Sequence, residues 1–209
     1  MLLALDTSGP TLSVGLFRGG ETLFEFGREI GRGHAELLRP TVENALESTG
    51  SHPRDLQRIA VCTGPGSFTG LRAGLAFARG LALPTGASPI GVGTMEVLAH
   101  RVENGGEPFV VVLDARRNEV FAQCFQEDGR PDGAPFRHRL DEPWPFGDRA
   151  VAGSGALLVA SRTLPYDPVP RPAVIARLAA ERDPERHPAS PFYGRGADAK
   201  PQASAPVAT

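Results

Sequence analysis

The sequence carries almost no net charge and almost no lysine. Its 22 Lys and Arg residues are balanced by 24 Asp and Glu residues, so the formal charge is −2, and Lys200 is the single lysine. A protein that binds nucleic acid on its own usually carries a basic excess that neutralises phosphates. The arginines here are instead scattered among acidic residues. The composition therefore disfavours an independent nucleic-acid-binding protein.

Cysteine and long apolar runs are also scarce. Cys62 and Cys124 lie in apolar stretches and are expected to be small buried side chains in a reducing compartment, unpaired with each other. The apolar start, residues 1–5, is too short for the core of a signal peptide. No later run approaches the about 20 apolar residues that span a bilayer. We therefore expect a cytoplasmic protein without a membrane segment.

Histidine pairs and nucleophile motifs are missing as well. No two of the five histidines lie within five residues of each other, so neither H-x-x-H nor H-x-x-x-H occurs. The G-x-S-x-G motif of serine hydrolases is also absent. The sequence therefore predicts neither catalytic residues nor a metal site.

Alternating apolar patterns and turn signals predict an α/β first half. The predicted strands cover residues 2–6, 12–17, 22–27, 58–63 and 88–92, and the predicted helices cover about 34–50, 70–83 and 94–102. This β-β-β-α-β-α-β-α order is that of the actin-like, RNase H-like folds. The first of two such subdomains is expected over residues 1–103.

A second, degenerate subdomain is expected over residues 104–190. Two strands, 109–114 and 119–125, repeat the opening hairpin, because the first again ends in an aspartate. Weaker patterns predict a strand at 150–152 and helices at 155–162 and 173–182, and residues 191–209 are interpreted as a tail.

The first strand ends in D-T-S, with Asp6 and Ser8 at the turn. In actin-like ATPases a carboxylate here helps to hold a nucleotide's metal; alternatively, both side chains bond to the turn's own backbone. The second phosphate loop of such proteins needs a glycine, but the sequence reads Asp114-Ala115-Arg116. Nucleotide binding is therefore expected to be weak at most.

A glycine-rich turn, G-P-G-S-F-T-G, covers residues 64–70. Gly64 and Gly66 allow a sharp turn, and Ser67 can cap the helix that follows. Amides at a helix N-terminus favour an anion, so these three residues are candidate phosphate contacts. No lysine follows, which excludes a Walker A loop.

The helix after this turn carries small residues every four positions, at Gly66, Gly70, Gly74, Ala78 and Ala82. Such positions lie along one face and allow another backbone to approach closely. The stripe therefore packs either on the protein's own sheet or on a partner helix, and the sequence leaves both open.

Several runs together resemble the TsaB (YeaZ) family. They are L-A-L-D-T-S (3–8), S-V-G-L (13–16), G-H-A-E-L-L-R-P (33–40), G-P-G-S-F-T-G-L-R-A-G-L-A-F-A-R-G-L-A (64–82) and L-D-A-R-R-N-E-V-F (113–121), with weaker signatures at 151–156 and 191–199. The resemblance is specific over the first 125 residues and thin beyond them.

The resemblance implies a non-catalytic subunit required for N6-threonylcarbamoylation of adenosine 37 in ANN-decoding tRNAs. Its implied partners are a TsaD-like transferase, which it scaffolds and activates, and a TsaE-like ATPase, with a homodimer as competitor and tRNA contacted only through the complex. No cofactor is required, although ATP or ADP could bind weakly at a partner interface. The alternative is an independent nucleotide hydrolase or metalloprotease of the actin-like superfamily.

The resemblance also places the partner interface on the N-terminal helices. The predicted interface residues are the apolar face of the first helix and the small stripe of the second, namely Leu37, Leu38, Val42, Gly70, Gly74 and Ala78. Close backbone approach at this stripe would make a two-helix surface that pairs with a paralogue or with itself.

Overall fold

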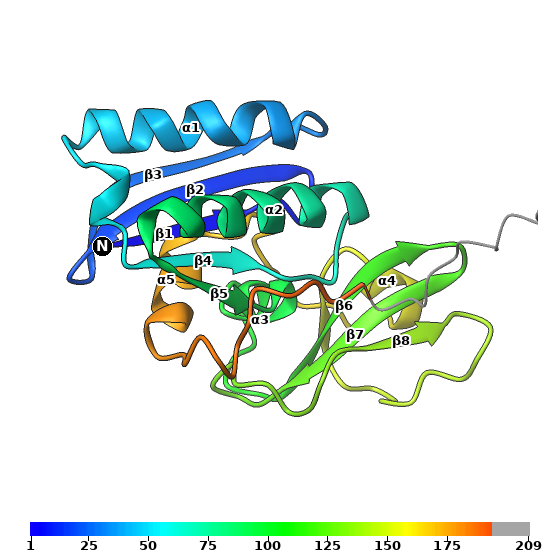
Figure 1. Cartoon of the computed structure of the whole chain (residues 1–209). Coiled ribbons are helices and arrows are strands. Elements are labelled where there is room, and N and C mark those ends of the chain that lie inside the picture. Colours follow the sequence, from blue (N-terminus) through cyan, green and yellow to red (C-terminus); the bar gives the residue numbers. More distant parts are fainter. Residues whose placement is uncertain (194–209) are drawn as a thin grey trace, which may run out of the picture.

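The structure, a computed structural model, describes residues 1–193 of the chain. The first subdomain is built on a five-stranded sheet of order β3-β2-β1-β4-β5 (Figure 1). Its strands are β1 (Leu2–Asp6), β2 (Thr11–Arg18), β3 (Glu21–Glu29), β4 (Arg58–Cys62) and β5 (Ser88–Val92). Its helical segments are α1 (His34–Ser48), η1 (Pro53–Asp55), α2 (Phe68–Thr85) and α3 (Thr94–Ala99).

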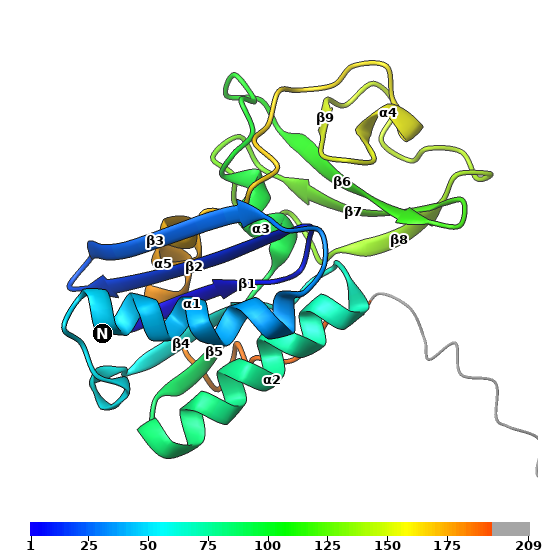
Figure 2. The same cartoon turned by 90° about the horizontal axis from the view of Figure 1, so that it is seen from above.

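The sequence pattern explains this sheet. The first three strands form an antiparallel meander, while β4 and β5 pair parallel to β1 through helical crossovers. Alternation along β1 sends Leu3 and Leu5 to the face that α1 and α2 cover, and Ala4 to the opposite face. Figure 2 shows α1 and α2 side by side over the sheet. The predicted strands of this half are confirmed.

The second subdomain contains a four-stranded sheet of order β8-β7-β6-β9. Its elements are β6 (Phe109–Arg116), β7 (Glu119–Phe125), β8 (Phe136–Arg139), β9 (Val151–Ala152) and α4 (Ala156–Val159). β6 pairs antiparallel with β7 and parallel with β9, as β1 does with β2 and β4. The predicted degenerate repeat is therefore present.

Four details differ from the sequence-based expectation. Strand β8 was not expected, because its sequence F-R-H-R carries two arginines; they point outward while His138 is buried. The helix expected at 94–102 ends at Ala99, and the one expected at 155–162 is only α4. Helix α2 continues one residue beyond Pro84 before Gly86, at φ 70°, ends it.

The second subdomain expected over residues 104–190 does not include residues 172–190 in space. Helix α5 (Pro172–Ala180) packs on the first sheet, where Ile175, Ala176 and Ala179 join the core of β1, β4 and β5. Residues 172–190 therefore belong in space to the first subdomain, although they follow the second in sequence. Most of the weak signature at 191–199 and most of the expected tail lie outside the described residues.

Arg58 fixes α5 in this position. One guanidinium nitrogen, Nη1, donates to the carbonyl oxygens of Ala179, Ala180 and Arg182 at 2.9, 3.2 and 3.2 Å. These carbonyls lie at the helix C-terminus, where intrahelical donors run out and a cation is favourable.

Replacing Arg58 by alanine is therefore expected to lower the free energy of unfolding by about 1–2 kcal/mol, because charged hydrogen bonds to these carbonyls are lost. Chemical denaturation would measure the change. Arg39→Ala is the control, since Arg39 makes only an exposed ion pair with Glu43 on α1, worth about 0.5 kcal/mol or less. Equal effects of the two substitutions would contradict the anchoring role.

Candidate functional site

The chain is buried where β1 passes into the turn that follows it, at Asp6, Thr7 and Ser8. Asp6 has no exposed surface, and its Oδ1 accepts hydrogen bonds from the Ser8 backbone N–H at 3.1 Å and the Ser8 Oγ at 2.6 Å. Burial raises the pKa of Asp6, and the bonds from Ser8 lower it only in part. One carboxylate oxygen of Asp6 and two donors of Ser8 are therefore used within the turn, as the second of the two alternatives expects.

Cys62, at the end of β4, lies beside this carboxyl group. Burial, and after it the neighbouring Asp6, raises the pKa of the Cys62 thiol well above its ordinary value. Both nucleophilic attack and metal binding require the thiolate, which this environment disfavours. Among residues 1–193, no group of three or more His, Cys, Asp or Glu side chains is arranged to hold a metal.

The glycine-rich turn approaches the protein's own backbone closely. A Cβ on Gly66 would lie 2.3 Å from the carbonyl oxygen of Ser8, and the Ser67 N–H donates to that same oxygen at 2.7 Å. Ser67 Oγ also accepts from the Gly70 N–H, so the predicted helix cap is confirmed. Two N–H groups of this turn, those of Ser67 and Gly70, are thus bonded within the chain.

At Gly64 the absence of a side chain allows a second close contact within the chain. Its φ is 103°, and a Cβ there would lie 2.6 Å from the carbonyl oxygen of Phe192. The C-terminal segment therefore covers this end of the turn. Phosphate binding by the candidate residues Asp6, Ser8, Gly64, Gly66 and Ser67 stays a prediction.

Asp114 occupies the corresponding position in the second subdomain. Its carboxylate accepts from the Arg116 N–H at 2.8 Å and pairs with the Arg116 guanidinium at 3.2 Å. Residues 116–118 all have positive φ, at 61°, 54° and 63°. A tight turn with Arg116 therefore stands where a phosphate loop would need a glycine.

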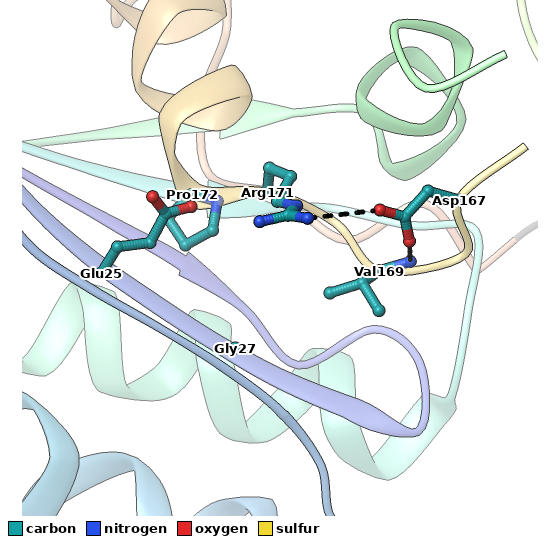
Figure 3. Close-up of a pocket in the computed structure, with 6 residues that line it drawn as sticks. All are labelled: Glu25, Gly27, Asp167, Val169, Arg171 and Pro172. Carbon is teal, nitrogen blue, oxygen red and sulfur yellow. Dashed lines mark hydrogen bonds and ion pairs between the residues drawn. The ribbon is translucent and has the colours of Figure 1, made fainter. Parts of the chain in front are cut away.

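Two depressions on the surface lie along the edge strand β3, and neither is lined by the candidate phosphate residues. The larger, of about 500 Å³, is lined by Glu25 and Gly27 of β3 and by the segment before α5 (Figure 3). Asp167 in its wall accepts from the Val169 N–H at 2.9 Å and pairs with Arg171 at 3.6 Å. The smaller, of about 350 Å³, lies between β3 and α1.

The small stripe of α2 faces the protein's own sheet. A Cβ on Gly70 would lie 2.0 Å from the carbonyl oxygen of Thr7, and one on Gly74 would lie 2.4 Å from Thr7 Oγ1. Thr7 Oγ1 in turn donates to the Gly70 carbonyl at 2.7 Å. The expectation that Gly70, Gly74 and Ala78 meet a partner is therefore wrong, because the helix needs them to approach β1 and β4.

The predicted face of α1 needs the same correction. Leu38 and Val42 are only 1% and 2% exposed and belong to the core between α1 and the sheet. Leu37, at 43%, is the exposed one among the six predicted interface residues. The apolar periodicity identified the buried face of an amphipathic helix.

The outer face of α2 was missed. Arg72, Ala76, Gly80 and Pro84 are exposed and also recur every four residues, two positions out of phase with the buried stripe. A Cβ on Gly80 would meet nothing within 4 Å. The four-residue repeat of this outer face was therefore present in the sequence. It could not be told apart from the repeat of the buried face, because both have the same spacing.

Two exposed large apolar side chains lie on the same helix. Phe68 at its start is 53% exposed and Leu83 near its end is 86% exposed. Single exposed apolar residues are common, but a face that combines them with small residues is typical of a protein contact. No helix within residues 1–193 has the length and apolar character required to cross a membrane.

Comparison with known proteins agrees with this architecture. A family model described as TsaD, tRNA N6-adenosine threonylcarbamoyltransferase, matches residues 28–131. The tRNA threonylcarbamoyladenosine biosynthesis protein TsaB of Escherichia coli K12 is 35% identical over 129 residues, which are 61% of this chain and 55% of that protein. The chain thus spans about half the length of that relative.

Other matches extend over nearly the whole chain. An uncharacterized protein of Mycobacterium bovis is 34% identical over 212 aligned residues, covering 97% of this chain and 95% of that protein. The solved structure of YeaZ from Pseudomonas aeruginosa has a TM-score of 0.75 at 28% identity and covers 92% of this chain and 98% of the other.

The two sheets, their repeated strand pairing and the helices that cover them define an actin-like α/β protein with a degenerate second subdomain. Its first turn and glycine-rich turn are packed against the chain itself. The chain belongs to the TsaB (YeaZ) family.

Proposed function

We propose that this chain is a non-catalytic subunit in the N6-threonylcarbamoylation of adenosine 37 in ANN-decoding tRNAs, where it scaffolds and activates a TsaD-type transferase. The observation that carries the proposal is its family membership: the named relatives are tRNA threonylcarbamoyladenosine biosynthesis proteins. A TsaE-type ATPase completes the machinery, and the complex acts in the cytoplasm.

The partner surface is the outer face of α2 together with Leu37 of α1. Residues 28–131, which include both helices, match the model of the transferase family, so the transferase is expected to carry a similar helix pair. Two such surfaces can pair pseudo-symmetrically, and a second copy of this chain competes for the same contact. An exposed mid-helix glycine costs up to about 1 kcal/mol relative to alanine, and Gly80 meets nothing in its own subunit. The close approach of a partner helix would explain a glycine at position 80.

The chain itself needs no cofactor and has no turnover of its own. The burial of Asp6 supports this, because a metal ligand must offer an ionised carboxylate and burial disfavours that form. ATP or ADP binds weakly at most, at a partner interface, and tRNA is contacted only through the complex. The net charge of −2 agrees with that indirect contact.

Reconstitution tests the proposal. The purified chain is combined with a TsaD-type transferase, a TsaE-type ATPase and the activated threonylcarbamoyl donor, and modification of an ANN-decoding tRNA is measured. We expect modification only when the chain is present, and neither protease nor ATPase turnover by the chain alone. Metal-dependent turnover by the chain alone, above that of an Asp6→Ala control, would support the alternative of an independent enzyme.

Replacing Gly80 by leucine is expected to weaken binding to the transferase by about a hundred-fold, equivalent to about 2.7 kcal/mol, because the side chain holds the partner helix away. The fold should be retained, since the position is open. Ala180→Leu is the matched control, because Ala180 is also an exposed helical residue but lies on α5 at the opposite face of the sheet. Calorimetry gives the affinity and thermal melting the stability. Unchanged affinity of Gly80→Leu would place the partner surface elsewhere.

A further inference from the structure

An aromatic–arginine cluster lies at the N-terminal end of α2. The rings of Phe68 and Tyr193 are 5.0 Å apart between centroids. The guanidinium carbon of Arg72 lies 3.9 Å from the centroid of the Phe68 ring and 5.9 Å from that of Tyr193. Arg72 Nε also donates to the Tyr193 hydroxyl at 3.3 Å. We name Phe68, Arg72 and Tyr193 the anchor cluster.

Residues 187–193 bring Tyr193 to this position from the other end of the chain. This segment passes β5 and the glycine-rich turn on its way to the start of α2 (Figure 1). Arg79 on α2 donates from Nε and Nη2 to the Ala189 carbonyl at 3.0 and 2.5 Å. The Phe192 N–H donates to the Thr63 carbonyl at 2.7 Å. Backbone hydrogen bonds and the hydrogen bonds from Arg79 thus hold the segment, and Tyr193 with it, against the first subdomain.

The charges of α2 are all of one sign. The helix contains no acidic residue, and its two charged side chains are Arg72 and Arg79. Arg79 is used inward, on Ala189. Arg72 is exposed, and among residues 1–193 no carboxylate forms an ion pair with it. The guanidinium therefore offers its outer nitrogens to a group that the described chain does not supply.

The cluster continues the proposed partner surface. Arg72, Ala76 and Gly80 are four residues apart and lie along one line of the helix. Exposed aromatic and arginine side chains are enriched among the residues that dominate interface energies. An arginine already held by rings loses little entropy on pairing, and its planar fork fits a carboxylate in a bidentate way.

We propose that the anchor cluster is a contact point for the transferase subunit, and that an aspartate or glutamate of that subunit pairs with Arg72 there. The proposal rests on the proposed function, because it names a contact within the same interface. Arg72 supplies the positive charge, and the rings of Phe68 and Tyr193 position its guanidinium group. Because Tyr193 belongs to the segment 187–193, the surface combines two distant parts of the sequence.

The test is the affinity of the full chain for the purified transferase at low and high salt, without tRNA. Arg72→Gln is expected to weaken binding about ten-fold at low salt, equivalent to about 1.4 kcal/mol, and to remove most of the salt dependence. Arg72→Lys should restore part of both, because the charge returns without the planar fork. Tyr193→Phe should weaken binding slightly, since the ring stays and only its hydroxyl is lost. Arg139→Gln, an exposed arginine of the second subdomain, is the control.

The outcomes separate this inference from the proposed function. If Gly80→Leu weakens binding and Arg72→Gln does not, the anchor cluster is overturned while the proposed function stands. If the wild-type chain does not bind the transferase at all, the proposed function fails and the inference with it. An Arg72→Gln effect that appears only after tRNA is added would mean a phosphate contact and would also overturn the inference.

Discussion

Gly74→Leu is expected to destabilise the protein strongly, in contrast to Gly80→Leu six residues further along the same helix. A Cβ at position 74 would lie 2.4 Å from Thr7 Oγ1 and 3.5 Å from the Val61 side chain. Thr7 cannot move freely, because it is 1% exposed and bonded to the Gly70 carbonyl. Overpacking a tight core costs about 1–3 kcal/mol and occasionally more. A leucine inserted between α2 and β1 should therefore cost at least about 3 kcal/mol, a sizeable part of a typical stability of about 5–15 kcal/mol.

The alanine variants give the sharper comparison. Gly74→Ala should destabilise the protein by about 2 kcal/mol, whereas Gly80→Ala should stabilise it by up to about 1 kcal/mol, because open space and a better helix former act together. Denaturant titration measures both. If Gly74→Ala is as stable as the wild type, the close packing of α2 on β1 is not as described.

Replacing Asp6 by asparagine should raise the melting temperature at pH 7. Asparagine keeps the oxygen that accepts from Ser8 and removes the ionisable group that burial disfavours. We expect a rise of more than about 2 °C, which corresponds to about 1 kcal/mol in a domain of this size. Asp6→Ala should lower it instead, because the Ser8 donors lose their acceptor. A lower melting temperature for Asp6→Asn would indicate an ionised, functional carboxylate.

The pH dependence gives an independent check. A carboxyl group with a raised pKa binds its proton more tightly in the folded state, so its contribution to stability falls as the pH rises above the ordinary value of 3.8. The gain from Asp6→Asn should therefore grow from pH 4 toward pH 7. Asp167→Asn is the control of opposite sign, because the Val169 N–H, with help from Arg101, lowers the pKa of Asp167. That substitution should lose stability at pH 7 and lose less as the pH falls.

Local signals in the sequence were sufficient for most of the first subdomain. Apolar alternation and turn residues marked β1 to β5, and Ser67 marked the start of α2. Each depends on interactions between residues close in sequence. Strand β8 was not predicted, because its two arginines suit an exposed strand face and leave no alternation of apolar residues to recognise. The position of α5 on the first sheet was not predicted, because the residues of a helix do not indicate which sheet it will cover.

The candidate site shows the same division. Asp6, Ser8 and Gly66 were singled out for residue types that serve either a phosphate or a tight turn. The structure gives them partners within the chain: Oδ1 of Asp6 accepts from Ser8, and the Ser8 carbonyl accepts from the Ser67 N–H beside Gly66. Those partners belong to β1 and to the turn after β4, which meet only because the two strands pair in parallel.

The sequence by itself determined the family, the actin-like strand order and the presence of a helix with small residues every four positions. It could not determine which side of that helix is buried, because Gly70 and Gly74 on one side and Ala76 and Gly80 on the other share the same spacing. Only the tertiary structure decided this, since the approach of Thr7 excludes a side chain on one face and leaves the other open. It alone also brought Tyr193 to Phe68 and Arg72, because backbone bonds to Thr63 and β5 fix the end of the described chain there.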